Sequence, residues 1–192
     1  MICKAGFLWD SPQLFNRYLQ DCSICCETIT PQLLAAPFFR GQYVALIIPT
    51  GFANRTYSRL LPALRSQSGR FQRFVERGGR LLVFGAADQR PDAYDWLWFR
   101  TEYAHSYAER KIVFESNSAF PPLVDESCSG PIATDGCFTA WEGERIAATE
   151  KGEVVMFSHP HGEGAVVLTT IHEYPSRKFV AQFCCGERET LF

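Results

Sequence analysis

Residues 78–89 of the chain read GGRLLVFGAADQ, and this stretch decides the fold. A pair of glycines precedes the short apolar run 81–84, and Gly-Ala-Ala follows it. Such a run between glycines is typical of a buried strand that ends in a tight turn. In open α/β sheets, the turn at the carboxyl end of a strand is where ligands bind and where nucleophiles lie. This turn carries no nucleophile, so a binding role has to be weighed against a catalytic one.

Further strands are expected in the first half of the chain. Residues 2–8 and 24–29 have the length and composition of strands. The run 43–48 (YVALII) is apolar throughout, which is typical of a central parallel strand covered on both faces. Because helical segments separate these runs, we expect right-handed crossovers and a parallel sheet with helices on both sides.

The helices between these strands have recognisable starts and stops. Ser11 suits an N-cap and Pro12 the first helical position, and Pro31 opens a short second helix. A long helix begins between residues 58 and 61 and ends at the glycine pair 78–79, with Ser-Gly at 68–69 loosening its middle.

The second half of the chain has a different pattern. The aromatic segment 92–99 suits a short helix or a loop packed on the core, and Ser176 caps a final helix. Between them, short strands separated by turns are expected at 112–114, 137–141, 145–148, 154–157 and 165–170. We therefore expect one domain over residues 1–192. Its fold class is α/β, a three-layer doubly wound, mainly parallel sheet with a β-rich insertion at about 103–157.

Composition narrows the range of functions. The formal net charge of −2 shows no excess of positive charge of the kind that binds nucleic acid. The basic run 65–80 is interleaved with phenylalanines, as on the solvated face of an amphipathic helix. No apolar stretch approaches the roughly 20 residues of a membrane-spanning helix. The first ten residues meet an acid at Asp10 and do not resemble a signal peptide, so we expect a cytoplasmic protein.

The eight cysteines allow more than one interpretation. Without a secretory signal, buried thiols are a better expectation than disulfides. A redox or zinc module stays open as an alternative, because some of the cysteines are grouped. The groups are the cluster Cys22, Cys25 and Cys26 and the pair Cys184 and Cys185, while Cys3, Cys128 and Cys137 stand alone.

His159 and His161 alternate around a proline and would share one face of a strand. Such a pair suits a metal ion if a third ligand joins it. Because no third ligand has suitable spacing and a glycine turn follows at 162–164, we expect two exposed turn histidines and no metal site.

Three motifs, in this order, carry a resemblance to a known family. They are ALIIPTGF at 45–52, FVERGGRLLVFGAADQ at 74–89 and GEGAVVLTTIHEYPS at 162–176. Together they resemble the class I glutamine amidotransferase-like superfamily. The resemblance implies a flavodoxin-like doubly wound sheet. It extends from residue 1 to about 180 and is weakest over 91–152.

The resemblance also locates a degenerate active site. The family's Pro-Gly-Gly turn, which helps to form the oxyanion hole, corresponds here to Pro49-Thr50-Gly51. Its nucleophile elbow, Cys-x-Gly-His-Gln, corresponds to a segment in which a glycine takes the place of the thiol. In order, the elbow positions are Gly85, Ala86, Ala87, Asp88 and Gln89.

The third family motif, His-Pro-Glu, is also altered. His172 matches the catalytic histidine, Glu173 lies one residue early for the glutamate, and Tyr174 takes its place. A base without a nucleophile cannot run a triad, so no glutamine amidotransferase activity is expected. The chain in this respect resembles noncatalytic branches of the superfamily, such as trehalose-utilisation-type proteins and the amidotransferase-like domains beside some biotin ligases.

We therefore expect a non-enzymatic domain that binds an unknown small molecule or a protein partner in this crevice, with no cofactor and no metal. The predicted binding residues are Thr50, Gly51, Phe52, Gly85, Ala86, Ala87, Asp88, Gln89, His172 and Glu173. The alternative is a hydrolase or lyase in which His172 is the base and an acid or a metal-activated water replaces the thiol. His172 and Glu173 could also serve only in helix capping and packing.

Large aromatic residues gather between residues 94 and 103. They could wall a pocket or a subunit interface, although core packing is their more usual role. The number of large apolar residues, with the habit of the family, favours a homodimer as one expectation.

Overall fold

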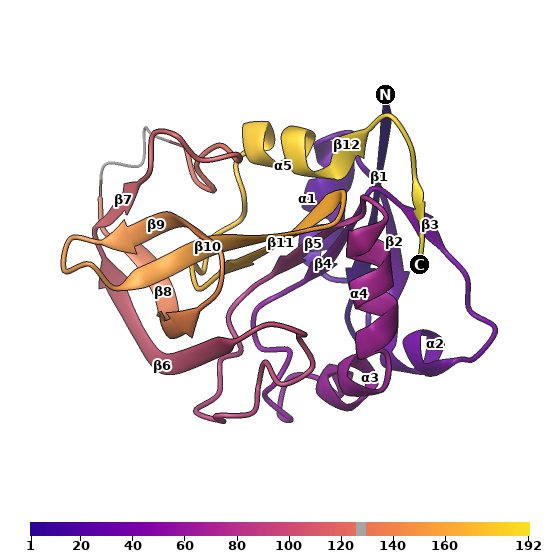
Figure 1. The fold of residues 1–192 in the computed structure, drawn as a ribbon, viewed down its shortest axis with the longest axis horizontal. Helices are drawn as coiled ribbons and strands as arrows, with labels where there is room; N and C mark the ends of the chain where they lie inside the picture. Colours follow the sequence, from indigo (N-terminus) through magenta and orange to yellow (C-terminus); the bar gives the residue numbers. More distant parts are fainter. Residues whose placement is uncertain (126–129) are drawn as a thin grey trace.

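The computed structural model describes residues 1–125 and 130–192 and has an α/β fold (Figure 1). Its central strands are parallel and run in the order β2, β1, β4, β5, β11. These strands span Cys25–Ile29, Ile2–Leu8, Ala45–Ile48, Arg80–Val83 and Gly164–Thr169. The carboxyl ends of these strands lie at one edge of the sheet. The turns of the three sequence motifs follow β4, β5 and β11, so they lie at this edge.

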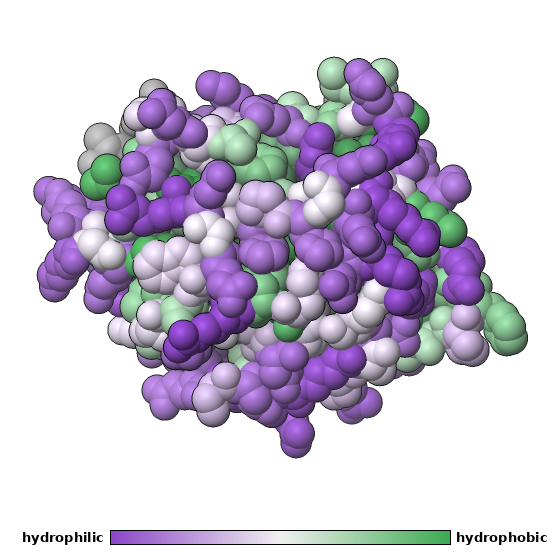
Figure 2. All heavy atoms as spheres, viewed as in Figure 1, coloured by the Kyte–Doolittle hydropathy of each residue, from purple (hydrophilic) through white to green (hydrophobic). Residues whose placement is uncertain are grey.

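The interior strands are apolar because both of their faces are covered. Every residue of β4 is buried, and Leu46 lies beside Leu81 of β5 in the parallel register. Helices α1 and α5 lie along one side of these strands and α3 and α4 along the other (Figure 1). The helices span Leu14–Asp21 (α1), Pro31–Ala35 (α2), Leu60–Ser66 (α3), Ser68–Glu76 (α4) and Arg177–Cys184 (α5). Polar side chains cover most of the face seen in Figure 2, with apolar residues scattered among them.

An antiparallel extension continues the sheet beyond β11. There β10 pairs with β11 through a tight hairpin, β9 and β8 pair with β10, and β6 pairs with β8. The strands span Thr101–Arg110 (β6), Ile112–Phe114 (β7), Ile132–Trp141 (β8), Glu144–Thr149 (β9) and Val154–His161 (β10). Three short strands, Gln42–Tyr43 (β3), Cys185–Gly186 (β12) and Thr190–Leu191 (β13), complete the description. Only the central part of the sheet is therefore parallel.

Several elements differ from the sequence-based expectation. Helix α1 begins at Leu14, after Gln13, whose N–H donates to Asn16 Oδ1 at 2.7 Å, so Ser11 is not the N-cap. The expected long helix is two helices that meet at Gln67. Strand β6 was not expected, because its residues are polar and its partial burial gives only a weak apolar alternation. Ser176 does cap α5, accepting a hydrogen bond from the Phe179 N–H at 3.1 Å.

The expectation of reduced, buried thiols is wrong for most of the cysteines. Strand β12 pairs antiparallel with β1, which sets Cys3 opposite Cys185, and the two form a disulfide. Cys25 is exposed, whereas Cys184 is buried. Cys22, Cys26 and Cys137 are partly exposed, and Cys128 lies outside the described residues. Burial raises the pKa of the Cys26 thiol to about 11, which disfavours the reactive thiolate.

Two classes of feature are absent from the part of the chain that the structure describes. No group of three or more histidine, cysteine or acidic side chains there could hold a metal ion. In residues 1–125 and 130–192, no helix is long and apolar enough to cross a membrane.

Candidate functional site

A cavity of about 540 Å³ opens at the carboxyl ends of the parallel strands. We call it the polar cavity, because nearly all of its lining side chains carry hydrogen-bonding groups. It is lined by Thr50, Gly51, Asn54, Tyr57, Ala87, His105, Tyr107, Asp135 and His172. Volumes of this size are typical of small-molecule sites.

A second cavity of about 320 Å³ adjoins it, and Thr50 and His172 line both. We call it the apolar cavity. Its walls are mostly aromatic and aliphatic, formed by Phe7, Trp9, Gln13, Leu14, Phe15, Pro49, Thr50, Phe84, His172, Glu173 and Tyr174. The two cavities together form a crevice with one polar and one apolar half.

The turn after β5 is built closely against the turn after β4. The Gly51 N–H donates to the Gly85 carbonyl at 2.9 Å, and the Asn54 side-chain amide donates to the Ala87 carbonyl at 3.0 Å. Ala87 has φ of 49°, a left-handed conformation that is unusual for a residue with a side chain. Strained residues of this kind cluster at functional turns. The strained position of this turn is thus Ala87, two residues after the glycine that the family motif aligns with the nucleophile.

Asp135 fills the space in which a side chain at position 85 would lie. A Cβ atom on Gly85 would overlap its carboxylate and lie 2.7 Å from both its Cβ and its Cγ. The turn at Gly85 therefore leaves no empty space for a side chain. A carboxylate supplied by β8 occupies that place.

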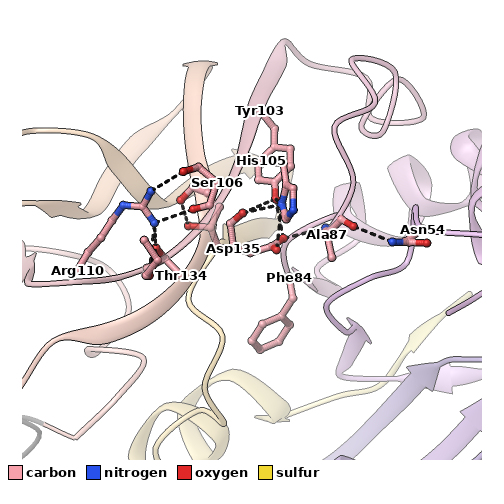
Figure 3. Close-up of polar contacts among 12 residues, drawn as sticks. Asn54, Phe84, Ala87, Tyr103, His105, Ser106, Arg110, Thr134 and Asp135 are labelled. Atoms are coloured by element: carbon pink, nitrogen blue, oxygen red, sulfur yellow. Dashed lines mark hydrogen bonds and ion pairs between the residues drawn. The ribbon is translucent and has the colours of Figure 1, made fainter. Parts of the chain in front are cut away.

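The Asp135 carboxylate is buried and held by hydrogen bonds (Figure 3). The Ala87 N–H donates to its Oδ2 at 2.8 Å, and the Tyr103 hydroxyl donates to the same oxygen at 2.6 Å. The second oxygen lies 3.3 Å from His105 Nδ1. Buried carboxylates need such partners, because an unpaired charge is costly away from water.

The Tyr103 hydroxyl acts as a hydrogen-bond donor in this network. Its burial, and next its hydrogen bond to Asp135, raise the pKa of Tyr103 well above the usual value for a phenol. Burial, followed by the Asp135 charge, also raises the pKa of the neighbouring Tyr94. Both hydroxyls therefore stay protonated at physiological pH.

His105 is oriented by the same carboxylate. Its Nδ1 lies 2.9 Å from the Asp135 backbone carbonyl as well as near the side chain. Since Tyr103 donates to Asp135, this geometry suits the tautomer that carries its proton on Nδ1, in which Nε2 is an acceptor. The ring also lines the polar cavity. A histidine held in one tautomer by an aspartate has the arrangement of a general base.

Strand β8 brings these groups together. On one side, residues 132–136 pair with β6, which carries Tyr103 and His105. On the other side, the Asp135 N–H donates to the Thr170 carbonyl at 2.7 Å, and the His172 N–H donates to the Ala133 carbonyl at 2.8 Å. Strand β8 therefore lies between β6 and the segment that carries Thr170 and His172.

A bulge in β6 directs His105 and Tyr107 toward the crevice. His105 lies opposite Gly136 while Ala108 lies opposite Thr134, so β6 has one extra residue between these pairs. The Arg110 side chain closes the bulge by donating to the Ser106 carbonyl at 2.9 Å and to the Thr134 hydroxyl (Figure 3). Bulges of this kind re-aim side chains next to functional sites.

His172, the base suggested by the family motif, has a different setting. It is exposed, and its ring meets Tyr107 edge to face at a centroid distance of 5.8 Å. It forms no ion pair with a carboxylate in residues 1–125 or 130–192. His172 therefore contributes to the crevice wall without the orienting partner that His105 has.

The predicted site residues divide into two groups. Thr50, Gly51, Ala87, His172 and Glu173 line one or both cavities. The others do not line the crevice. Phe52 packs in the core against Tyr94 and Trp96, while Gly85 and Ala86 are buried beneath the turn, and Asp88 and Gln89 line neither cavity.

His105 and Asp135 are site residues that the sequence did not predict, and Tyr103 was expected only as one of the aromatic residues that could wall a pocket. The alternation of Tyr103 and His105 was a usable signal, because residues two apart share one face of a strand. No local signal marks Asp135, whose partners are more than 29 residues away in the sequence.

His159 and His161 lie in strand β10 and not in the turn that follows. His159 stacks on Phe99 at a centroid distance of 3.8 Å, and His161 packs on Trp98 at 5.1 Å. These aromatic contacts show that His159 and His161 have a packing role in the antiparallel extension.

Comparison with known proteins finds similarity in fold only. No protein-family model matches the chain, and no curated protein does. A putative GMP synthase protein from Thermoplasma acidophilum aligns with a TM-score of 0.59 at 10% identity, over 96% of this chain and 93% of that one. Cytoplasmic Protein STM1381 from Salmonella typhimurium LT2 aligns with a TM-score of 0.53 at 16% identity, over 92% of each chain.

A much larger enzyme contains a similar part. The β-galactosidase of Rahnella sp. R3 aligns with a TM-score of 0.59 at 15% identity, over 94% of this chain. The chain spans only 30% of that enzyme's length. At these identities the similarities concern the fold alone, and they are consistent with a glutamine amidotransferase-like fold.

Proposed function

We propose that this is a non-enzymatic amidotransferase-like domain that binds a small hydroxylated molecule in the crevice. The observation that carries the proposal is the polar cavity, in which side chains from two halves of the sheet converge. Its groups both donate and accept hydrogen bonds, as a sugar or polyol requires.

Charge favours a neutral ligand over an acid. The Gly51 and Ala87 N–H groups, which could have bound an anion, already donate to the Gly85 carbonyl and to Asp135. The buried Asp135 carboxylate would also repel an anion. An acidic metabolite is therefore a weaker candidate than an uncharged one.

Exposed rings surround the opening of the crevice. Tyr57 and Tyr107 at the polar cavity are 62% and 63% exposed, and Tyr174 at the apolar cavity is 49% exposed. Large exposed rings that gather around one opening are a feature of ligand-binding grooves. A ligand with a hydroxylated part and an apolar part would cover both halves of the crevice.

Saturation-transfer NMR with glucose, galactose and myo-inositol tests the proposal, with glutamate and citrate as acidic probes. We expect the neutral probes to bind and His172→Ala to weaken their binding about tenfold, through loss of one hydrogen bond to the ligand. His159→Ala, which removes a histidine packed outside the crevice, is the matched control and should leave binding unchanged. Preference for the acids, or equal losses in both variants, would contradict the proposal.

A second candidate function is acid–base catalysis on the same ligand class, favoured by the orientation of His105 by Asp135. His105, and not His172, would be the base, acting through Nε2 on a water molecule or a substrate hydroxyl.

Hydrolysis of 4-nitrophenyl acetate gives a general test of this second function. We expect a slow turnover that His105→Asn reduces by about 100-fold, with His172→Asn reducing it far less. Turnover that is equal in wild type and His105→Asn excludes His105 as a base.

A further inference from the structure

A separate cavity of about 310 Å³ lies against helix α4 and shares no lining residue with the crevice. We call it the arginine pocket. It is lined by Pro37, Arg40, Gln67, Arg70, Arg73, Arg77, Leu191 and Phe192. In the fold, α4 lies beside the strand β3 and the carboxyl-terminal segment (Figure 1). Arg77 precedes the amino end of β5, so this part of the pocket lies away from the crevice edge of the sheet.

The arginines of this pocket have no carboxylate partners. No aspartate or glutamate lines the cavity, and none of its four arginines forms an ion pair within the described residues. Other arginines of the chain do, including Arg65 with Asp92 at 2.6 Å and Arg145 with Glu115 at 2.6 Å. In a chain of net charge −2, four unneutralised guanidinium groups in one pocket form a local concentration of positive charge.

Arg70 holds the floor of the pocket in place. It donates to the Phe39 carbonyl at 3.0 Å and to the Gln67 side chain at 3.3 Å, and it lies 4.5 Å from the centre of the Phe192 ring. Burial, and next the charges of Arg40 and Arg73, lower the pKa of Arg70. The like charges are thus close enough to repel one another, and a bound anion would relieve that repulsion.

We infer that the arginine pocket binds the phosphate group of a phosphate monoester. Arg40, Arg73 and Arg77 are exposed. Arg40 already donates through Nη1 to the Pro37 and Phe39 carbonyls, at 3.2 and 2.9 Å, so Arg73 and Arg77 are the main donors to phosphate oxygens. A phosphate presents close to two charges and three oxygens at one centre, which suits several converging guanidinium groups better than a single carboxylate does. Leu191 and Phe192 give an apolar surface to the organic part of the ester.

Isothermal titration of the whole chain with glycerol 3-phosphate and with pyrophosphate tests the inference, and succinate serves as a carboxylate probe whose charge is similar to that of glycerol 3-phosphate. We expect saturable binding of both phosphates that the double variant Arg73→Gln/Arg77→Gln weakens at least about tenfold. The control variant Arg100→Gln/Arg145→Gln removes the same charge at exposed positions elsewhere, and its affinity should stay within about twofold of wild type because distant surface charges are screened.

Three results would overturn the inference. They are the absence of saturable phosphate binding by the wild type, an equal loss in the control variant, and binding of succinate as tight as that of pyrophosphate. Sedimentation with vesicles containing phosphatidic acid distinguishes the source of the phosphate. Vesicle binding that Arg73→Gln/Arg77→Gln abolishes assigns a lipid headgroup, and glycerol 3-phosphate binding without vesicle binding assigns a soluble ester.

Discussion

Replacing Gly85 by alanine is expected to lower the free energy of unfolding by about 3 kcal/mol, although it adds a single methyl group. The new Cβ would lie 2.7 Å from Cβ and Cγ of Asp135, on a strand end that is buried. Neither the sheet nor the hydrogen-bonded carboxylate can move aside without losing contacts. Urea denaturation followed by circular dichroism measures the loss.

A glycine elsewhere provides the control for this substitution. Gly69 lies exposed in helix α4, where a Cβ would only meet the flexible end of Arg73 at 3.4 Å. Gly69→Ala should raise stability by up to about 1 kcal/mol, because alanine favours the helix. If Gly85→Ala proves as harmless as Gly69→Ala, Asp135 does not occupy the space that we assign to it.

Replacing Asp135 by alanine is expected to cost about 3 kcal/mol of stability, for a different reason. The substitution leaves the Ala87 N–H without its acceptor, and the Tyr103 hydroxyl keeps only the backbone carbonyl of residue 135, at 2.8 Å. Buried donors that lose their acceptor are costly. Thermal or urea denaturation measures the loss, and Asp88→Ala, at a partly exposed position, is the control with an expected change within about 0.5 kcal/mol.

Double variants show whether the losses arise from these contacts. In Asp135→Ala/Tyr103→Phe the hydroxyl that lost the carboxylate is gone, so the combined loss should be smaller than the sum of the two single losses. In Gly85→Ala/Asp135→Ala the overlap with the carboxylate is gone and only the overlap with Cβ of residue 135 remains, so part of the Gly85→Ala loss should be recovered. Strict additivity in both pairs would mean that the network contributes little to stability.

Gly85 and Asp135 depend on each other in this structure. Gly85 admits the Asp135 carboxylate, and the carboxylate in turn orients His105. A nucleophile at position 85 and the buried aspartate exclude each other in this backbone. The glycine is therefore part of an arrangement in which the Asp135 carboxylate takes the place of a side chain at position 85.

The sequence by itself determined the parallel centre of the sheet. Residues 43–48 and 81–84 are apolar runs between turn residues, and local composition of this kind specifies buried strands wherever they are placed. The same local signals determined the cap of α5, the turns of the antiparallel extension and the edge at which Thr50, Ala87 and His172 meet.

Only the tertiary structure decided what that edge contains. Strand β6 is polar and pairs through a bulge, so its sequence carries little strand signal, yet it supplies Tyr103 and His105. Asp135 reaches Gly85 across 50 residues of chain, and Cys3 reaches Cys185 across 182. Local propensity depends on residues that are neighbours in the sequence. Contacts between residues far apart in the sequence depend instead on which strands pair and in which register. That register is set by the packing of the whole sheet.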